Sequence, residues 1–302
     1  MCNVYGLEEF RKGLENPWLV YSELCKPFLR AFTHFNRSTL GKTGLRVMDE
    51  DWDNLIILDG CRYDTFVKHS TLPGEARRVI SGGSSSPEFM QYNFSNREFP
   101  GTVYISANPH LVRQELASNF YRDIQVWDSQ WDSSLKTVPP EAVVDASIEA
   151  YKTYPNKRLI IHFMQPHYPF IGTTGRQISQ SGLLDDSETN RIWDKLRHRE
   201  VSRDVVLRAY EENLEVVLPH IHELIDSLDG KSVVTSDHGN AFGRFGVFGH
   251  PHRTFIEDLV VVPWLEIDGN RRDICLGDLR DEESASDANI IRDRLSHLGY
   301  LE

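Results

Sequence analysis

Short, uninterrupted apolar runs recur along the chain, and polar or glycine residues follow each of them. Such runs, without polar alternation, are typical of strands that are covered on both faces of a sheet. The predicted strands are residues 54–58, a short strand ending at 79–80, and residues 102–107, 124–127, 158–164 and 232–236. A further strand at 259–267 contains Pro263, which predicts an edge or bulged position because proline cannot donate to a neighbouring strand.

Between these runs, apolar residues recur at three- and four-residue steps, the spacing of one face of a helix. The predicted helices are residues 1–36, 109–120, 139–154, 188–228 and 282–299, and the predicted loops beside the site are residues 172–187 and 242–252. Strands that alternate with helices predict an α/β fold, here a three-layer α/β/α sandwich with a largely parallel central sheet. We expect residues 1–50 to form an N-terminal helical extension and residues 51–302 to form the main domain.

The net charge of −12 over 302 residues argues against two classes of partner. Nucleic-acid phosphates and anionic membrane surfaces both attract basic surfaces rather than acidic ones. The four cysteines are scattered without a C-x-x-C spacing, so they predict neither a disulfide framework nor a zinc knuckle. No run of about 18 apolar residues and no signal-peptide pattern is present, so we expect a cytoplasmic protein without a membrane span.

Ionisable residues stand where the predicted strands end. Asp59 follows one strand, His167 follows another between two prolines that are expected to hold it on an exposed turn, and Asp237-His238 follow a third. The glycine-rich segment after them carries His250. Because ligands gather beyond the carboxyl ends of parallel strands, we expect these side chains to meet in one site. The ordinary alternatives are a helix cap for Asp59 and surface turns for the histidines.

A serine cluster, Ser84-Ser85-Ser86, precedes Pro87. Serines with glycines are typical of a flexible turn, but a proline in the first turn also fits a helix N-terminus. A hydroxyl there would face free backbone N–H groups and the positive end of the helix dipole, which favours an anionic substrate.

Carboxylate, imidazole and hydroxyl groups without thiolates predict a divalent metal such as Zn²⁺, Mn²⁺, Mg²⁺ or Ca²⁺. Such an ion would lower the pKa of a bound hydroxyl and neutralise charge on a tetrahedral oxyanion. A serine beside it is a candidate nucleophile for phosphoryl or sulfuryl transfer, and a histidine is a candidate proton donor to the leaving group.

Taken in order, the motifs resemble the alkaline phosphatase superfamily, and within it the sulfatase-like branch. They are a strand ending in Asp59 with Arg62 and Asp64 after it, an H-x-x-x-P-H-x-P-F segment at residues 162–170, and T-S-D-H-G at residues 235–239. The last segment, residues 294–301, is similar to the closing helix of many sulfatase-like chains, so the resemblance covers residues 53–301. It implies an alkaline phosphatase-like catalytic domain over residues 51–302.

The resemblance also implies roles for individual residues. The implied metal ligands are Asp59, Ser86, Asp237 and His238. Ser86 aligns best with the nucleophilic threonine of the branch, while Ser84 and Ser85 remain open as nucleophiles. His167 and His250 look like residues that meet the substrate or its leaving group, or like ligands of a second metal.

Two departures from true sulfatases change the expected chemistry. Sulfatases carry C-x-P-x-R, whose cysteine becomes formylglycine, and neither Cys61 nor Ser86 stands in that motif. They also usually have two consecutive acids where this chain has Asp59-Gly60. We therefore expect a metal-dependent hydrolase or transferase with a serine nucleophile, acting on phosphate mono- or diesters of a small molecule or glycan. The alternatives are a sulfate-ester hydrolase that uses Ser86 directly, and a non-catalytic metal- or glycan-binding protein.

Overall fold

A computed structural model describes residues 24, 25, 27, 33, 36, 44–178, 192–277 and 279. The predicted helix at 282–299, residues 179–187 of one predicted loop, and most of the predicted extension at 1–50 lie outside these residues. Within the predicted helix at 1–36, the described residues are helical; they are Leu24, Cys25, Pro27, Thr33 and Asn36.

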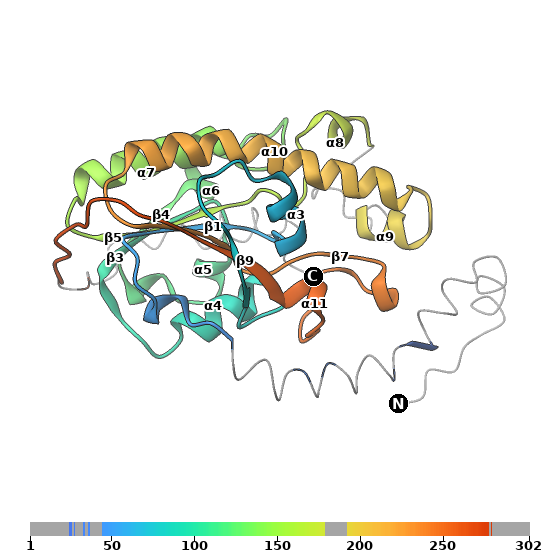
Figure 1. Ribbon diagram of the computed structural model, residues 1–302, viewed down its shortest axis with the longest axis horizontal. Coiled ribbons are helices and arrows are strands. Elements are labelled where there is room, and N and C mark those ends of the chain that lie inside the picture. Colours follow the sequence, from blue (N-terminus) through green and yellow to red (C-terminus); the bar gives the residue numbers. More distant parts are fainter. Residues whose placement is uncertain are drawn as a thin grey trace.

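Among the described residues, a seven-stranded sheet has the order β2-β9-β6-β1-β5-β3-β4 (Figure 1). Its strands are β1 (Asn54–Leu58), β2 (Arg77–Ile80), β3 (Phe99–Ser106), β4 (Phe120–Gln125), β5 (Arg158–Phe163), β6 (Ser232–Ser236) and β9 (Val261–Ile267). Strands β6, β1, β5, β3 and β4 pair in parallel, and β9 is antiparallel to both of its neighbours. The predicted α/β class with a largely parallel sheet is confirmed.

Helices connect these strands and cover the sheet. They are α3 (Tyr63–His69), α4 (Ser86–Phe94), α5 (His110–Arg113), α6 (Val126–Ser129), α7 (Pro140–Thr153), α8 (Thr173–Gln177), α9 (Ile192–Arg197), α10 (Arg203–Ser227) and α11 (Glu257–Val260). Short 3₁₀ turns are η2 (Val47–Asp49), η3 (Ala117–Asn119) and η5 (Arg244–Gly246), and β7 (Ala241–Phe242) and β8 (Phe248–Gly249) form a small hairpin. In the described part of the chain, no helix combines the length and the apolar character needed to cross a bilayer.

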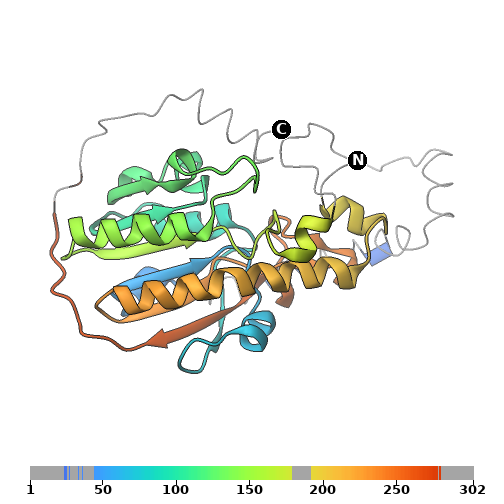
Figure 2. The same ribbon diagram turned by 90° about the horizontal axis from the view of Figure 1, so that it is seen from above.

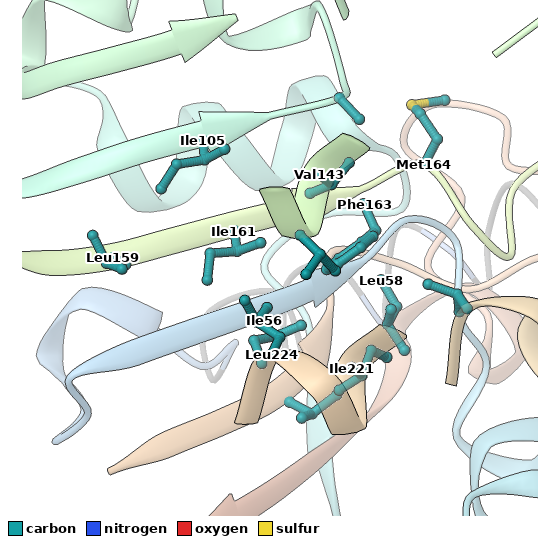
Figure 3. Close-up of a cluster of buried hydrophobic side chains, with 14 of the residues drawn as sticks. Ile56, Leu58, Ile105, Val143, Leu159, Ile161, Phe163, Met164, Ile221 and Leu224 are labelled. Carbon is teal, nitrogen blue, oxygen red and sulfur yellow. The ribbon is translucent and has the colours of Figure 1, made fainter. Parts of the chain in front are cut away.

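Strand β1 sends alternate side chains into two cores. Ile56 and Leu58 pack with residues of α7 and α10 in one cluster, part of which Figure 3 shows. Leu55 and Ile57 pack with residues of α4 in the other cluster. Because successive strand residues face opposite sides of a sheet, an uninterrupted apolar run fits a strand between two helical layers. Figures 1 and 2 show α7 and α10 side by side over one face, and Figure 1 shows α4 on the other. The three-layer arrangement is confirmed.

Some predicted boundaries of helices and strands were wrong. At these places the backbone changes conformation although the spacing of apolar residues continues. The helix predicted at 109–120 is α5 followed by η3, since Glu115 takes a left-handed conformation with φ of 56°. The strand predicted at 124–127 begins at Phe120 and gives way to α6 at Val126. The helix predicted at 188–228 is split into α9 and α10, with Arg199 at φ of 60° between them. Part of the loop predicted at 172–187 is helix α8.

The predicted edge position of the strand with Pro263 was also wrong. Strand β9 lies between β2 and β6, and β2 is the edge strand. The carbonyl of Pro263 faces β6, where it accepts a hydrogen bond from Thr235 Oγ1 at 2.7 Å. The pairing of β6 with β9 ends at Thr235 opposite Trp264, so on the side of β6 the missing N–H of Pro263 falls one residue past the paired region, while Pro263 lies opposite Arg78 of β2.

Candidate functional site

Two neighbouring strands bring the predicted metal ligands together. Strands β1 and β6 are parallel with Leu58 opposite Ser236, so Asp59 and Asp237-His238, which follow them, emerge at the same edge of the sheet. His238 Nε2 is 3.5 Å from Asp59 Oδ1 and 3.5 Å from Asp237 Oδ2. One ligand atom from each of the three residues lies within 4.8 Å of the other two, and all three side chains are buried.

Ser86 is the serine that faces these ligands. It is the first residue of α4, and its Oγ lies 3.3 Å from His238 Nε2 and 3.4 Å from Asp59 Oδ2. The first backbone N–H groups of a helix have no partner within the helix. The hydroxyl therefore lies between a cluster of metal-ligand atoms and a helix terminus suited to an anion.

The other two serines have different partners. Ser85 Oγ contacts His252 Nδ1 at 3.1 Å. Ser84 Oγ donates to Glu88 Oε2 at 2.7 Å and also accepts from the backbone N–H of Thr254 at 3.2 Å. These contacts use the hydroxyls of Ser84 and Ser85 to connect the start of α4 to the loop after His250, which leaves Ser86 as the serine with a nucleophile's surroundings.

Asn108 is a residue of the site that sequence reasoning missed. Its Nδ2 donates to Asp59 Oδ2 at 2.6 Å and lies 3.2 Å from Ser86 Oγ. Its Oδ1 accepts from the backbone N–H of His110 at 2.8 Å, which fixes the direction of the amide. The available signal was its position directly after the strand predicted at 102–107, which is the same signal that identified Asp59.

His162 is the second residue of this site to which the sequence analysis assigned no role. It lies in β5, is fully buried, and its Nε2 is 3.8 Å from Asp237 Oδ2 and 4.0 Å from Asp59 Oδ2. Its Nδ1 contacts the hydroxyl of Tyr104 at 2.9 Å. An imidazole inside an otherwise apolar central strand was the signal, because a buried polar group needs a partner.

His167 and His250 form a pair beside the metal-ligand cluster. Their Nε2 atoms are 2.9 Å apart, and the ring centroid of His250 is 4.6 Å from that of His238. The expectation that His167 is exposed was wrong, since only 3% of it is accessible. The backbone N–H of His167 donates to the Asp59 carbonyl at 3.1 Å, and its carbonyl accepts from Asn213 Nδ2 at 2.9 Å. These two hydrogen bonds fix the backbone of His167 inside the protein.

The negative charges of the two buried carboxyl groups, Asp59 and Asp237, oppose each other. Burial raises the pKa of Asp59 well above its usual range, and the negative charge of Asp237 raises it further. Burial also acts to raise the pKa of Asp237, but interactions with His238 and His162 outweigh it and leave that pKa below its usual value. A divalent cation would relieve both the desolvation and the repulsion because it supplies positive charge between the two groups.

His162, His167 and His250 are neutral near pH 7. Burial lowers the pKa of His162 and that of His167 to about 4 each. Burial, followed by the neighbouring histidines, lowers the pKa of His250 well below its usual value. A neutral imidazole has a free nitrogen that can accept a proton or bind a metal.

Ligand atoms without partners identify where a cation fits. Among the described residues, Asp59 Oδ1 and Asp237 Oδ2 are buried and make no hydrogen bond. Buried polar atoms are normally paired, and these two oxygens converge on His238 Nε2. Oxygen and imidazole donors at this spacing suit a divalent ion such as Zn²⁺ or Mn²⁺. The residues present therefore fit the predicted metal.

Arg62 and Asp64 of the first motif lie beside this cluster. The guanidinium of Arg62 donates to Asp64 at 2.8 and 2.5 Å, and its Nη1 lies 3.0 Å from Asp258 Oδ2. Arg62 is also the N-cap residue of α3. Asp59 is therefore not the cap of this helix, and the alternative role considered for it does not hold.

Gly60 gives a physical reason for the missing second acid. Its φ of +66° is left-handed, and a Cβ added there would lie 2.6 Å from Asn240 Nδ2. Its N–H donates to Asp237 Oδ1 at 3.0 Å, so the turn that needs this conformation also orients a predicted metal ligand.

We expect Gly60→Ala to lower the free energy of unfolding by about 1–3 kcal/mol, the cost of a left-handed non-glycine residue. Urea denaturation followed by circular dichroism would measure it. Gly101→Ala is the control, because its φ is not positive and the nearest atom to the added methyl would be the side-chain Cδ2 of Leu276. Equal losses in the two variants would contradict the strain at Gly60.

Comparison with known proteins places the chain among structures of low sequence identity. No protein-family model matches the chain, and no curated protein is similar to it in sequence. Similar solved structures include the integral membrane lipooligosaccharide phosphoethanolamine transferase A from Neisseria meningitidis, with 11% identity and a TM-score of 0.48. That alignment covers 72% of this chain and 47% of the transferase, so this chain spans about half of that protein.

Two further structures are similar at the same level. One is the periplasmic domain of EcEptC from Escherichia coli in a complex with zinc, with 11% identity, a TM-score of 0.44, and coverage of 73% of this chain and 74% of that one. The other, from Vibrio parahaemolyticus, has 12% identity, a TM-score of 0.38, and coverage of 74% of this chain and 62% of that one. It is described as a protein in the alkaline phosphatase superfamily, the superfamily that the sequence motifs of this chain resemble.

Proposed function

We propose that the chain is a metal-dependent phosphoesterase or phosphotransferase that attacks a phosphate mono- or diester with Ser86. The observation that carries the proposal is the position of Ser86 Oγ. It lies 3.3 Å from His238 Nε2 and 3.4 Å from Asp59 Oδ2, at the start of a helix. Serine is a weak nucleophile until a base, a metal or a lowered pKa activates it, and this position places the hydroxyl beside the metal-ligand cluster.

Asp59, Asp237 and His238 are the residues that would hold the metal, with Ser86 Oγ as a further ligand. A bound Zn²⁺, Mn²⁺, Mg²⁺ or Ca²⁺ would supply Lewis acidity at the Ser86 hydroxyl and offset the charge of a phosphoryl oxygen. Asn108 supports the same step by keeping its Nδ2 at 3.2 Å from Ser86 Oγ. The N–H that Asn108 directs at Ser86 Oγ would donate to negative charge that develops beside the serine.

His167 and His250 are proposed to serve the leaving group. The 2.9 Å contact between their Nε2 atoms requires that one ring donates a proton and the other accepts it. His250 is the more accessible of the two, so it is the one that can meet a substrate. A proton released when Ser86 attacks would be taken up by the neutral pair and given to the departing oxygen as its bond to phosphorus breaks.

Phosphate is proposed ahead of sulfate because the chain offers an unmodified hydroxyl rather than a formylglycine. Cys61 does not supply the missing group: it is fully buried, its Sγ lies 3.8 Å from the Arg62 carbonyl, and burial raises the pKa of its thiol. A sulfate ester would have to be attacked by Ser86 itself. The alternative function, sulfate-ester hydrolysis, can therefore be tested with the same serine.

The test is release of nitrophenol from mono- and diester nitrophenyl phosphates by the full chain, with Zn²⁺ or Mn²⁺ added after chelator treatment. We expect metal-dependent release from at least one phosphate ester, and slower release from nitrophenyl sulfate. Faster release from the sulfate would favour sulfate-ester hydrolysis. Bound metal without turnover of any ester, and without a covalent phosphoserine, would favour the non-catalytic binding protein.

The remaining features of the proposal follow from the sequence. We propose residues 51–302 as the catalytic domain and residues 1–50 as a helical extension of it. The cytoplasmic location and a small-molecule or glycan ester as the substrate stay predictions.

A further inference from the structure

His162 lies behind the two carboxylates of the cluster and has one unpaired nitrogen. It is fully buried in β5, next to β1 in the sheet. Within the described residues its Nε2 makes no hydrogen bond, although Asp237 Oδ2 is 3.8 Å away and Asp59 Oδ2 is 4.0 Å away. His162 Nε2 is therefore a buried polar atom near two carboxylates, and the proposed function gives it no role.

Tyr104 determines which nitrogen of His162 carries the proton. Its hydroxyl is fully buried and lies 2.9 Å from His162 Nδ1. If the hydroxyl donates to Nδ1, the tyrosine proton is satisfied and the imidazole proton lies on Nε2. The opposite arrangement would bury an unused tyrosine O–H and direct a lone pair at two carboxylates. The arrangement with Nε2–H facing the acids is therefore the favoured one.

Resting on the proposed function, we infer that His162 is a positioning residue that hydrogen-bonds the metal-binding carboxylates through Nε2–H, with Tyr104 holding its tautomer. A movement of less than about 1 Å would bring Nε2 within hydrogen-bond distance of Asp237 Oδ2. Metal-bound carboxylates are commonly oriented by hydrogen bonds from residues that do not touch the metal. A carboxylate oxygen accepts such a bond and binds a cation at the same time because it has two lone pairs.

A ligand role for His162 is less consistent with the geometry. Among the described residues, the ligand atoms that lie within 4.8 Å of one another come from Asp59, Asp237 and His238, and His162 is outside that group. Its place in a central strand also limits its movement toward His238. His162 therefore acts on the carboxylates, which lie between it and the metal position.

Zn²⁺ affinity tests this inference without reference to turnover. Chelator-stripped protein would compete for Zn²⁺ with a chromophoric chelator. Loss of a hydrogen-bond partner to a metal ligand typically costs 10–100-fold in affinity, so His162→Leu is expected to weaken binding by about that factor. Glutamine can place an amide N–H near the position of Nε2, so His162→Gln is expected to restore affinity to within about 3-fold of the wild-type value.

Two tyrosine variants separate this role from general effects on packing. Tyr104→Phe keeps the ring and removes only the hydroxyl, and an affinity loss of about 10-fold is expected because the tautomer is no longer held. Tyr92→Phe is the matched control. Its hydroxyl donates to the Gly44 carbonyl at 2.7 Å and contacts none of the predicted metal ligands, so no change is expected. Thermal unfolding of the metal-free variants shows that each is folded.

The possible outcomes separate this inference from the proposed function. If the wild-type protein binds no Zn²⁺, the metal site and the positioning role both fail. If the wild-type protein binds Zn²⁺ and His162→Leu binds it equally well, the positioning role alone is overturned. If His162→Gln binds as weakly as His162→Leu, the residue acts as a ligand or as a space-filling group rather than as a donor.

Discussion

Replacing Ser86 by alanine is expected to lower kcat for a phosphate ester by at least about 10³-fold, because loss of a catalytic nucleophile removes the covalent route. The fold should remain intact, since the hydrogen-bond contacts of Ser86 Oγ with the described residues are all to groups of the site. Its partners are Asp59 Oδ2 at 3.4 Å, His238 Nε2 at 3.3 Å and Asn108 Nδ2 at 3.2 Å. The measurements are steady-state kinetics and acid-quench trapping of a phosphoserine by mass spectrometry.

Ser85→Ala is the matched control for this prediction. Ser85 is the N-cap residue of α4 but makes no side-chain capping bond, and its hydroxyl contacts His252 Nδ1. We expect the variant to retain activity within a few-fold and to form the same phosphopeptide at Ser86. A phosphopeptide that carries the modification on Ser84 or Ser85, or full activity in Ser86→Ala, would assign the nucleophile elsewhere.

Asp237→Asn is expected to remove metal binding and, with it, activity. The change keeps the shape of the side chain, and its Oδ1 can still accept from the N–H groups of Gly60 and His238. It removes the charge opposite Asp59 and also the charge that His238 and His162 favour, so the stability of each metal-free protein is its own reference. At a free Zn²⁺ concentration of 100 times Kd, binding stabilises the wild type by about 2.7 kcal/mol. The free energy of unfolding of the variant should not increase when Zn²⁺ is added.

Thermal and urea unfolding with and without Zn²⁺ would measure the difference, and metal analysis of the purified proteins would give the stoichiometry. Asp123→Asn is the control because Asp123 lies on the edge strand β4, where it accepts from Gln125 Nε2 at 2.7 Å. Zn²⁺ should raise the free energy of unfolding of this control as much as it raises that of the wild type. Equal gains in Asp237→Asn and wild type would show that the metal binds elsewhere.

Much of the fold could be predicted from local patterns. Apolar runs such as 54–58 and 232–236 identified central strands because a strand between two helical layers needs apolar side chains on both faces. The errors occurred where the spacing of apolar residues does not indicate the backbone conformation or the order of the strands. Glu115 and Arg199 adopt left-handed conformations, which the periodicity of apolar residues cannot predict. Pro263 lies in an inner strand because its missing N–H falls where pairing with β6 has ended.

The candidate site was partly visible for the same reason. Asp59, Asp237 and His238 could be placed together because they follow strands, and the carboxyl ends of parallel strands share one edge. Asn108 had the same signal and was passed over. His162 could not be placed, because its role depends on which strands neighbour β5 and on which way the Tyr104 hydroxyl points.

The sequence by itself determined the class of fold, the edge of the sheet that carries the chemistry, and the kinds of ligand atom available there. Residue type and strand order suffice for these, since both are local properties of the chain. Only the tertiary structure decided which of three adjacent serines faces the acids, that His167 is buried against His250, and that Tyr104 and His162 stand behind the carboxylates. These depend on side-chain directions and distances between segments far apart in the chain, which arise only when the sheet is assembled.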